Sequence, residues 1–211
     1  MSKISLKHSG GNVVSLNSPT NAPGAADVAF KLPNADGSAG QFMKTDGSGN
    51  LSFDAAGGGK FASYAIICDQ KSSGTSGGTF TSGGWYTRDL NTEIADADGI
   101  VSISSNKFTL QAGTYLIKAS APAYRSQDHQ ITLYRTSGTQ AHIAFGTSAY
   151  TNTTAMTRSS LDVRVTLSTA TDFEIRHRCS NTISGNGFGE SVGFPDGSVE
   201  TYSIVEIYKE S

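Results

Sequence analysis

The chain has 211 residues, a formal net charge of −2, a charged fraction of 16% and 24 glycines. This composition suits many short strands joined by polar turns, and it argues against helical bundles, coiled coils and disordered chains. The near-neutral charge lacks the basic footprint of a nucleic-acid binder or of a protein held on an anionic membrane. We therefore expect a soluble protein that neither binds nucleic acid nor inserts into a membrane.

The amino terminus and the two cysteines indicate the same cellular compartment. The amino terminus, MSKISLKHSGG, has no apolar stretch typical of a secretion signal. Cys68 and Cys179 are far apart in the sequence and have none of the short spacings of zinc or redox motifs. We expect both to be small core residues of a protein made in a reducing cytoplasm.

Residues 1–54 contain small apolar groups separated by turn signals, and we assign them to an N-terminal stalk or attachment segment of short strands and irregular chain. Within it, residues 42–53 predict a strand, an Asp-Gly turn and a second strand. The apolar surface is too small for an independent monomeric core. The glycine-rich run at 55–60 predicts a flexible hinge, which leaves residues 61–211 as the head domain.

Short strand patterns with polar turns between them fill the rest of the chain. No helical periodicity is present, and without helical crossovers a parallel sheet is excluded. The fold class that we predict is therefore all-β, a sandwich or jelly roll. The predicted strands lie at 61–69, 85–94, 106–111, 113–121, 129–136, 140–147, 158–168, 171–179 and 199–209.

The first and last of these strands differ from the others in their two faces. Residues 161–167 and 173–179 alternate cleanly between apolar and polar, so one face is buried and the other meets water. Residues 61–68 and 202–208 are apolar or aromatic on both faces. A single sandwich covers only one face, so the second cover is most simply another subunit.

The head resembles a known family. The stretch NKFTLQAGTYLI at 106–117 resembles the strand, tight glycine turn and aromatic-bearing strand of the complement component 1q and tumour necrosis factor superfamily. WYTRDLN at 85–91 and YSIVEIY at 202–208 fall where that jelly roll has an early strand and its last one. The resemblance implies a trimer whose first and last strands line the threefold axis. The interface candidates are Tyr64, Ile66, Tyr202, Ile204 and Tyr208.

The leading segment suggests a setting for the head. KLPNADGSAGQFMKTDGSGNL at 31–51 is similar to pieces of tail-fibre and other virion proteins of bacteriophages. Together the two resemblances imply a homotrimeric virion protein, a tail fibre, tip or capsid-attached fibre, that contributes to recognition of the host surface. Its location would be the virion, after synthesis in the host cytoplasm. Its partners would be its own copies, other virion proteins through the N-terminal segment, and a host cell-surface glycan or protein.

Two alternatives stay open. One is a free trimeric lectin- or cytokine-like binding module that is not part of a virion. The other is a purely architectural protein that trimerises or decorates without binding a ligand. The chain has neither a collagen-like Gly-X-Y stalk nor a signal peptide, and both absences argue against a secreted signalling role.

Strand alternation locates the loops on which a partner would bind. If the last strand runs toward the stalk, the connections near 122–128, 147–157 and 180–198 lie at the far end of the head. Loops on a rigid sandwich often carry function, and aromatic rings with amides and carboxylates would suit a glycan-coated surface. The candidate ligand-binding residues there are Tyr124, Arg125, Asp128, Tyr150, Asn152, Asn186, Phe188 and Glu190.

No enzyme signature stands out. A hydrolase needs a positioned nucleophile or a carboxylate pair. His177 and Cys179 share a strand face with apolar residues, so we place both in the core. Asp96, Asp98 and Gly99 lack the remaining ligand positions of a calcium loop and predict a turn. We expect a non-enzymatic protein with no catalytic residue, no cofactor and no metal.

Overall fold

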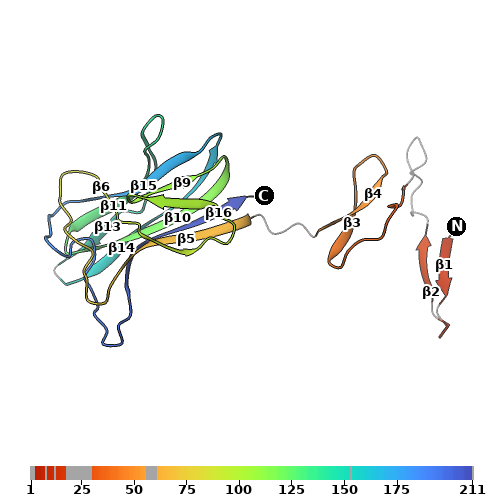
Figure 1. Ribbon diagram of the computed structural model, residues 1–211, viewed down its shortest axis with the longest axis horizontal. Helices are drawn as coiled ribbons and strands as arrows, with labels where there is room; N and C mark the ends of the chain where they lie inside the picture. The colour runs from red at the N-terminus through yellow and green to blue at the C-terminus, as the bar shows by residue number, and fades with distance from the viewer. Residues whose placement is uncertain are drawn as a thin grey trace. The chain divides into compact units, whose positions relative to one another are not determined.

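The computed structural model describes residues 3–7, 9–11, 13–17, 30–55, 61–152 and 154–210. The chain divides into two compact units, residues 1–57 and 58–211 (Figure 1). Strands are the regular secondary structure of the described residues, which contain no helix long and apolar enough to cross a membrane. Most of the predicted hinge at 55–60 lies outside the described residues.

The first unit contains two hairpins. β3 (Gln41–Thr45) pairs with β4 (Leu51–Ala55), as the sequence predicts. In the turn between them, the Asp46 carboxylate accepts hydrogen bonds from two backbone amides, and Gly47 takes a φ of +79°, which glycine adopts without strain. A second hairpin, β1 (Lys3–Lys7) with β2 (Val13–Asn17), was not predicted. All five residues of β3 are exposed, in keeping with the small apolar content of this unit.

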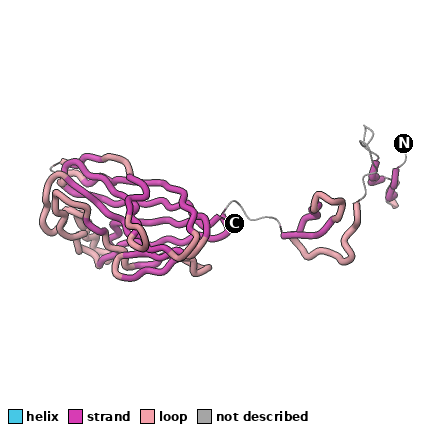
Figure 2. The backbone as a smooth tube through the Cα atoms, turned by 90° about the horizontal axis from the view of Figure 1, so that it is seen from above, coloured by secondary structure: helices cyan, strands magenta, loops and turns pink. Residues whose placement is uncertain are grey.

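The second unit, called the head from here on, is a sandwich of two antiparallel sheets (Figures 1 and 2). One sheet has five strands in the order β14-β10-β16-β5-β7. The other has seven strands, in the order β12-β11-β15-β9-β8 with β13 beside β11 and β6 beside β15. The strands are β5 (Phe61–Lys71), β6 (Tyr86–Thr87), β7 (Thr92–Ala95), β8 (Val101–Ser104), β9 (Lys107–Leu110), β10 (Gly113–Tyr124), β11 (Gln127–Arg135), β12 (Ala141–Phe145), β13 (Ala149–Thr151), β14 (Met156–Leu167), β15 (Thr171–Cys179) and β16 (Glu200–Glu210).

The chain crosses repeatedly from one sheet to the other, which defines a jelly roll. From β9 to β11 it passes from the seven-stranded sheet to the five-stranded sheet and back, and β14, β15 and β16 repeat the alternation. The inward-facing side chains of both sheets form one apolar core. Its fully buried members include Ile67, Phe108, Leu110, Tyr115, Ile117, Ile131, Leu133, Val205 and Ile207. The predicted all-β jelly-roll class is confirmed.

Three details of the head differ from the prediction. The strand expected at 85–94 is two short strands, β6 and β7, in different sheets. They separate because Arg88, between them, is fully buried and hydrogen-bonded to Ser203 of β16 (2.9 Å). The short strands β8 and β13 were not predicted, since they are too short to show a clear alternation. The other predicted strands are confirmed with small shifts at their ends.

The predicted placement of the loops is also confirmed. Glu210 at the end of β16 pairs with Phe61 at the start of β5, and Figure 1 shows these two ends side by side. Tyr124 at the end of β10 pairs with Met156 at the opposite end of the sheet. The β10–β11, β13–β14 and β15–β16 connections therefore lie at the end of the head away from Phe61, called the distal end from here on.

Candidate functional site

The outward face of the five-stranded sheet carries apolar side chains at its centre. Tyr64 on β5 lies opposite Tyr208 on β16, which in turn lies opposite Leu116 on β10. Tyr64 is 54% exposed, and Ile66, Leu116, Ile204 and Tyr208 are half-buried. We call these five side chains the apolar face. Within the described part of the head, no second layer of chain lies over Tyr64.

Charged and polar groups lie within and beside the apolar face, since Glu206 stands between Ile66 on β5 and Lys118 on β10. Lys118 pairs with Asp162 across β10 and β14 (2.8 Å), and Arg164 makes two bonds of 2.7 Å to Glu210. The Tyr208 hydroxyl donates to Glu206 (2.9 Å), and this bond raises the pKa of the phenol. Protein–protein interfaces combine apolar contacts with hydrogen bonds and polar groups of this kind.

The position of Tyr202 contradicts its predicted place in the trimer interface. It lies on β16 like the interface candidates, but its ring is only 2% exposed within its own chain. The hydroxyl donates to the backbone carbonyl of Thr75 (2.7 Å). Gly189 lies so close that a Cβ there would be 2.3 Å from the ring. The chain itself supplies the second cover of Tyr202, so this residue does not belong to an exposed interface.

The two connections that cover Tyr202, residues 72–85 and 180–199, are called the distal loops. The Gly77 amide of one donates to the Gly189 carbonyl of the other (2.8 Å). Glu200, at the start of β16, accepts hydrogen bonds from three amides of the two loops at 2.8 to 3.1 Å. These backbone amides lower the pKa of Glu200. The distal loops are therefore tied to each other and to the sheet.

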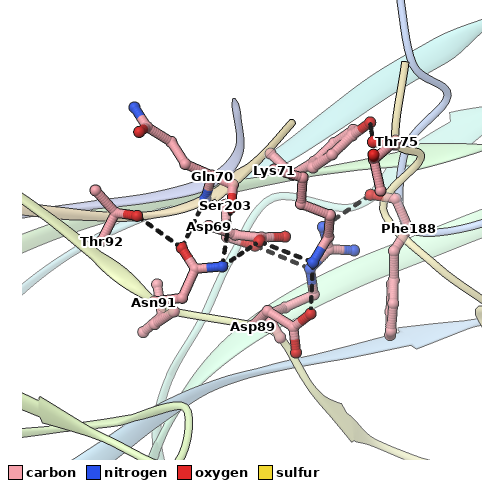
Figure 3. Close-up of polar contacts among 12 residues, drawn as sticks. Asp69, Gln70, Lys71, Thr75, Asp89, Asn91, Thr92, Phe188 and Ser203 are labelled. Carbon is pink, nitrogen blue, oxygen red and sulfur yellow. Dashed lines mark hydrogen bonds and ion pairs between the residues drawn. The ribbon is translucent and has the colours of Figure 1, made fainter. Parts of the chain in front are cut away.

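A partly buried charged cluster lies next to the distal loops (Figure 3). Lys71 pairs with Asp69 (3.1 Å) and with Asp89 (2.8 Å). The guanidinium of Arg88 donates to the carbonyl of Phe188 (2.7 Å). Burial lowers the pKa of Arg88 to about 9. The cluster joins β5, the segment before β7 and one distal loop, and it thereby positions the distal end.

The eight predicted ligand-binding residues do not form one site. Asp128 and Tyr150 lie opposite each other on β11 and β13, and Tyr150 is 58% exposed. The others pair among themselves or stand alone, with Arg125 over the Tyr124 ring (5.8 Å), Asn186 hydrogen-bonded to Glu190, and Asn152 exposed.

Phe188 has a packing contact that the sequence did not reveal. Its ring lies 4.4 Å from that of Phe80 and 4.1 Å from the guanidinium carbon of Arg88. Phe80 is fully buried and Phe188 is half-buried against it. The Phe188 ring therefore anchors a distal loop to the interior, which corrects its assignment to a ligand surface.

A hollow of about 620 Å³ lies on the outward face of the seven-stranded sheet. Of the eight predicted ligand-binding residues, Asp128 is the member that lines it. We call it the Trp85 hollow. The side chains that line it include Ser82, Trp85, Asp128, Gln130, Ser148, Arg178 and Ser180.

The strand register explains why these side chains meet. His129 on β11 pairs with Cys179 on β15, and both are buried, at 3% and 4% exposure. Side chains alternate along a strand, so Asp128 and Gln130, which flank His129, point outward, as does Arg178 on β15, which pairs with Gln130. The hollow therefore rests on two central strands.

An aromatic cluster borders the hollow. The Trp85 ring lies 5.1 Å from His142 and 5.8 Å from Phe145, and Phe145 is 57% exposed. Trp85 itself is half-buried. Sequence reasoning did not identify this residue as part of a site. The available signal was a sole tryptophan in a stretch rich in glycine and serine, but its aromatic neighbours on β12 come from a distant part of the sequence.

A histidine pair lies directly beneath the hollow. His129 Nδ1 is 3.0 Å from His177 Nε2, and His129 Nε2 is 2.8 Å from the Thr157 hydroxyl. Burial lowers the pKa of His129 to about 4 and that of His177 well below its usual range. Burial also raises the pKa of Cys179 to about 11. The interior position predicted for His177 and Cys179 is confirmed, and in the folded chain both imidazoles are neutral and the thiol is protonated at pH 7.

Comparison with known proteins yields similarity to solved structures only. No protein-family model matches the chain, and no curated protein matches it. The chain is similar to murine APRIL, at 9% identity over 70% of this chain and 98% of that one, with a TM-score of 0.47. It is also similar to the globular domain of zebrafish complement 1qA, at 15% identity over 69% and 95% of the two chains, with a TM-score of 0.43. Eiger TNF from S. frugiperda shows 13% identity over 70% and 92%, with a TM-score of 0.46.

Proposed function

We propose that the protein is a homotrimeric binding module in which the apolar faces of three copies pack around one axis. The observation that carries the proposal is the uncovered apolar face, with Tyr64 and Tyr208 at its centre. A ring of copies covers such a face in every subunit at once. We propose three copies, and not another number, because the head sequence resembles a superfamily whose members are trimers.

We further propose that the trimer belongs to a phage particle, as a tail fibre, tip or capsid-attached fibre. Two observations support this setting. The sequence at 31–51 is similar to pieces of phage virion proteins, and the exposed side chains of β3 suggest that the first unit buries its surface against a partner. Mass spectrometry of purified particles tests the setting. Presence in particles is expected, and absence from them would favour a free trimeric module.

Native mass measured by light scattering tests the trimer. The full-length chain is expected to have the mass of three copies. Tyr64→Asp places a charge in the centre of the proposed interface, and we expect the mass of this variant to fall toward that of one chain. Phe194→Asp is the matched control, because Phe194 is as exposed as Tyr64, at 59%, but lies in a distal loop.

The control should keep the mass of three chains. A wild-type chain with the mass of one copy would overturn the proposal. Equal dissociation of both variants would show that the apolar face is not the interface.

A further inference from the structure

We infer that the Trp85 hollow is a saccharide-binding site. The inference rests on the proposed function in one respect, since it names the ligand class of the binding module. Each hollow is nevertheless built from a single chain, so binding to it does not require the trimer. A concave surface with an aromatic wall and a few polar groups is the usual form of a small-ligand site.

The aromatic wall offers a platform for one face of a sugar ring. Trp85 is held by its contacts with His142 and Phe145 and is still half-exposed. No hydrogen-bond partner for the indole N–H occurs among the residues that the structure describes, so this group is available to a hydroxyl oxygen. An amphipathic ring of this kind offers an apolar surface and a donor at one place.

The polar wall supplies both acceptors and donors. The Gln130 amide nitrogen donates to the Gly146 carbonyl (2.7 Å), which fixes the side chain and leaves its oxygen as an acceptor. The Asp128 carboxylate accepts a bond from Ser180 (3.2 Å) and retains further acceptor capacity. Arg178 is exposed, and in the described part of the chain its guanidinium has no ion-pair partner. Neighbouring sugar hydroxyls both donate and accept, and this set matches them.

The mixture of charges in the Trp85 hollow favours a saccharide over a nucleic acid as its ligand. Stacking on an aromatic ring also suits nucleobases. However, the Asp128 carboxylate lies in the same hollow and would repel a phosphate backbone, and the chain as a whole carries a net charge of −2. The bonds to Gly146 and Ser180 hold Gln130 and Asp128 in place, so these two side chains need little ordering on binding.

The sole tryptophan provides a direct readout. We would titrate the full-length protein with a methyl hexoside, an N-acetylhexosamine and a hexuronate, and follow Trp85 fluorescence. A saturable change with at least one of these sugars is expected. An array of bacterial-surface glycans, read with labelled protein, extends the panel to longer chains. If neither the three sugars nor any glycan of the array binds, the inference is overturned.

Variants locate the site. By calorimetry, Trp85→Ala and Gln130→Ala are each expected to weaken binding by about tenfold or more, which corresponds to the loss of roughly 1.4 kcal/mol. Phe194→Ala, an exposed aromatic outside the hollow, should bind as the wild type does. Binding that survives Trp85→Ala unchanged would overturn the inference. If Arg178→Ala selectively loses binding of the hexuronate, the ligand is an acidic sugar. If it loses binding of all the sugars equally, the ligand is a neutral sugar.

Light scattering on the same samples separates the two proposals. A chain that binds sugar but has the mass of one copy would overturn the trimer and leave the hollow as a saccharide site. A trimer whose wild-type hollow binds no sugar would overturn only the saccharide site.

Discussion

The buried imidazoles of His129 and His177 tie the stability of the head to pH. Their folded-state pKa values are depressed, to about 4 for His129, whereas a histidine in an unfolded chain titrates near 6.5. The unfolded state therefore takes up protons at a higher pH than the folded state does. The stability that this difference provides is complete above about pH 6.5 and is lost as the pH falls toward 4.

We expect the melting temperature of the full-length protein to fall between pH 6.5 and pH 4. Each histidine contributes a slope of up to about 1.4 kcal/mol per pH unit in this range. The double variant His129→Gln/His177→Gln should show a smaller pH dependence, whatever its stability at pH 7. His142→Gln is the control, since His142 is exposed and should change the slope less. An unchanged slope in the double variant would contradict the assignment.

Residue-scale prediction from the sequence succeeded where alternation decides the environment. The apolar neighbours of His177 and Cys179 on one strand face were enough to place both inside. The environment of Tyr202 could not be predicted in this way, because its cover comes from loops far away in the sequence. The same holds for Trp85, whose site depends on the register of β11 with β15 and on the approach of β12.

Among the elements, the distal loop 180–199 depends on one close approach. Gly189 has a φ of +147° and lies against the Tyr202 ring. Gly197 in the same loop has a φ of +79°, but nothing lies within 4 Å of a Cβ built there. A substitution at Gly197 therefore tests backbone strain alone, and a substitution at Gly189 tests backbone strain together with a steric clash.

We expect Gly197→Ala to lower the free energy of unfolding by about 1 kcal/mol, the usual cost of a side chain in the left-handed region. Gly189→Ala should cost roughly 1–3 kcal/mol more, because its Cβ overlaps the buried tyrosine. Urea unfolding of the two variants checks the difference. Equal values for both would mean that the loop moves away from Tyr202 without cost.

The strands themselves were largely predictable, and the exceptions have a common cause. β10, β14 and β15 are long enough for alternation to define them. The segment 85–94 has strand-forming residues, but Arg88 turns into the interior between the sheets and divides it. A buried arginine cannot be recognised from local sequence, because its partners Ser203 and Phe188 belong to other elements.

At the scale of the whole molecule, the head has its own core and the first unit has little. We expect residues 58–211 to fold and to assemble without the first unit. Circular dichroism should show a sheet spectrum with a cooperative melt close to that of the full chain, and light scattering should give the mass of three copies. A fragment that fails to melt cooperatively would show that the first unit contributes to folding.

A trimer would present three Trp85 hollows at once. Three weak sites on one body can raise the overall affinity for a repetitive surface by roughly 10²–10⁴-fold, if the spacing of the ligands allows simultaneous contact. A monomeric variant such as Tyr64→Asp would then keep its affinity for a single sugar and lose its retention on a dense glycan layer.

The start of β5 and the end of β16 define a mechanical axis for the head. Phe61 and Glu210 lie at one end of the sheet, and the strands run from there toward the distal end. If the head were anchored near Phe61 and pulled at the distal end, the load would run parallel to its strands. The hydrogen bonds of the ladders run across that direction, so many of them resist sliding together instead of opening one after another. Tension applied between these two ends would therefore load the ladders in shear.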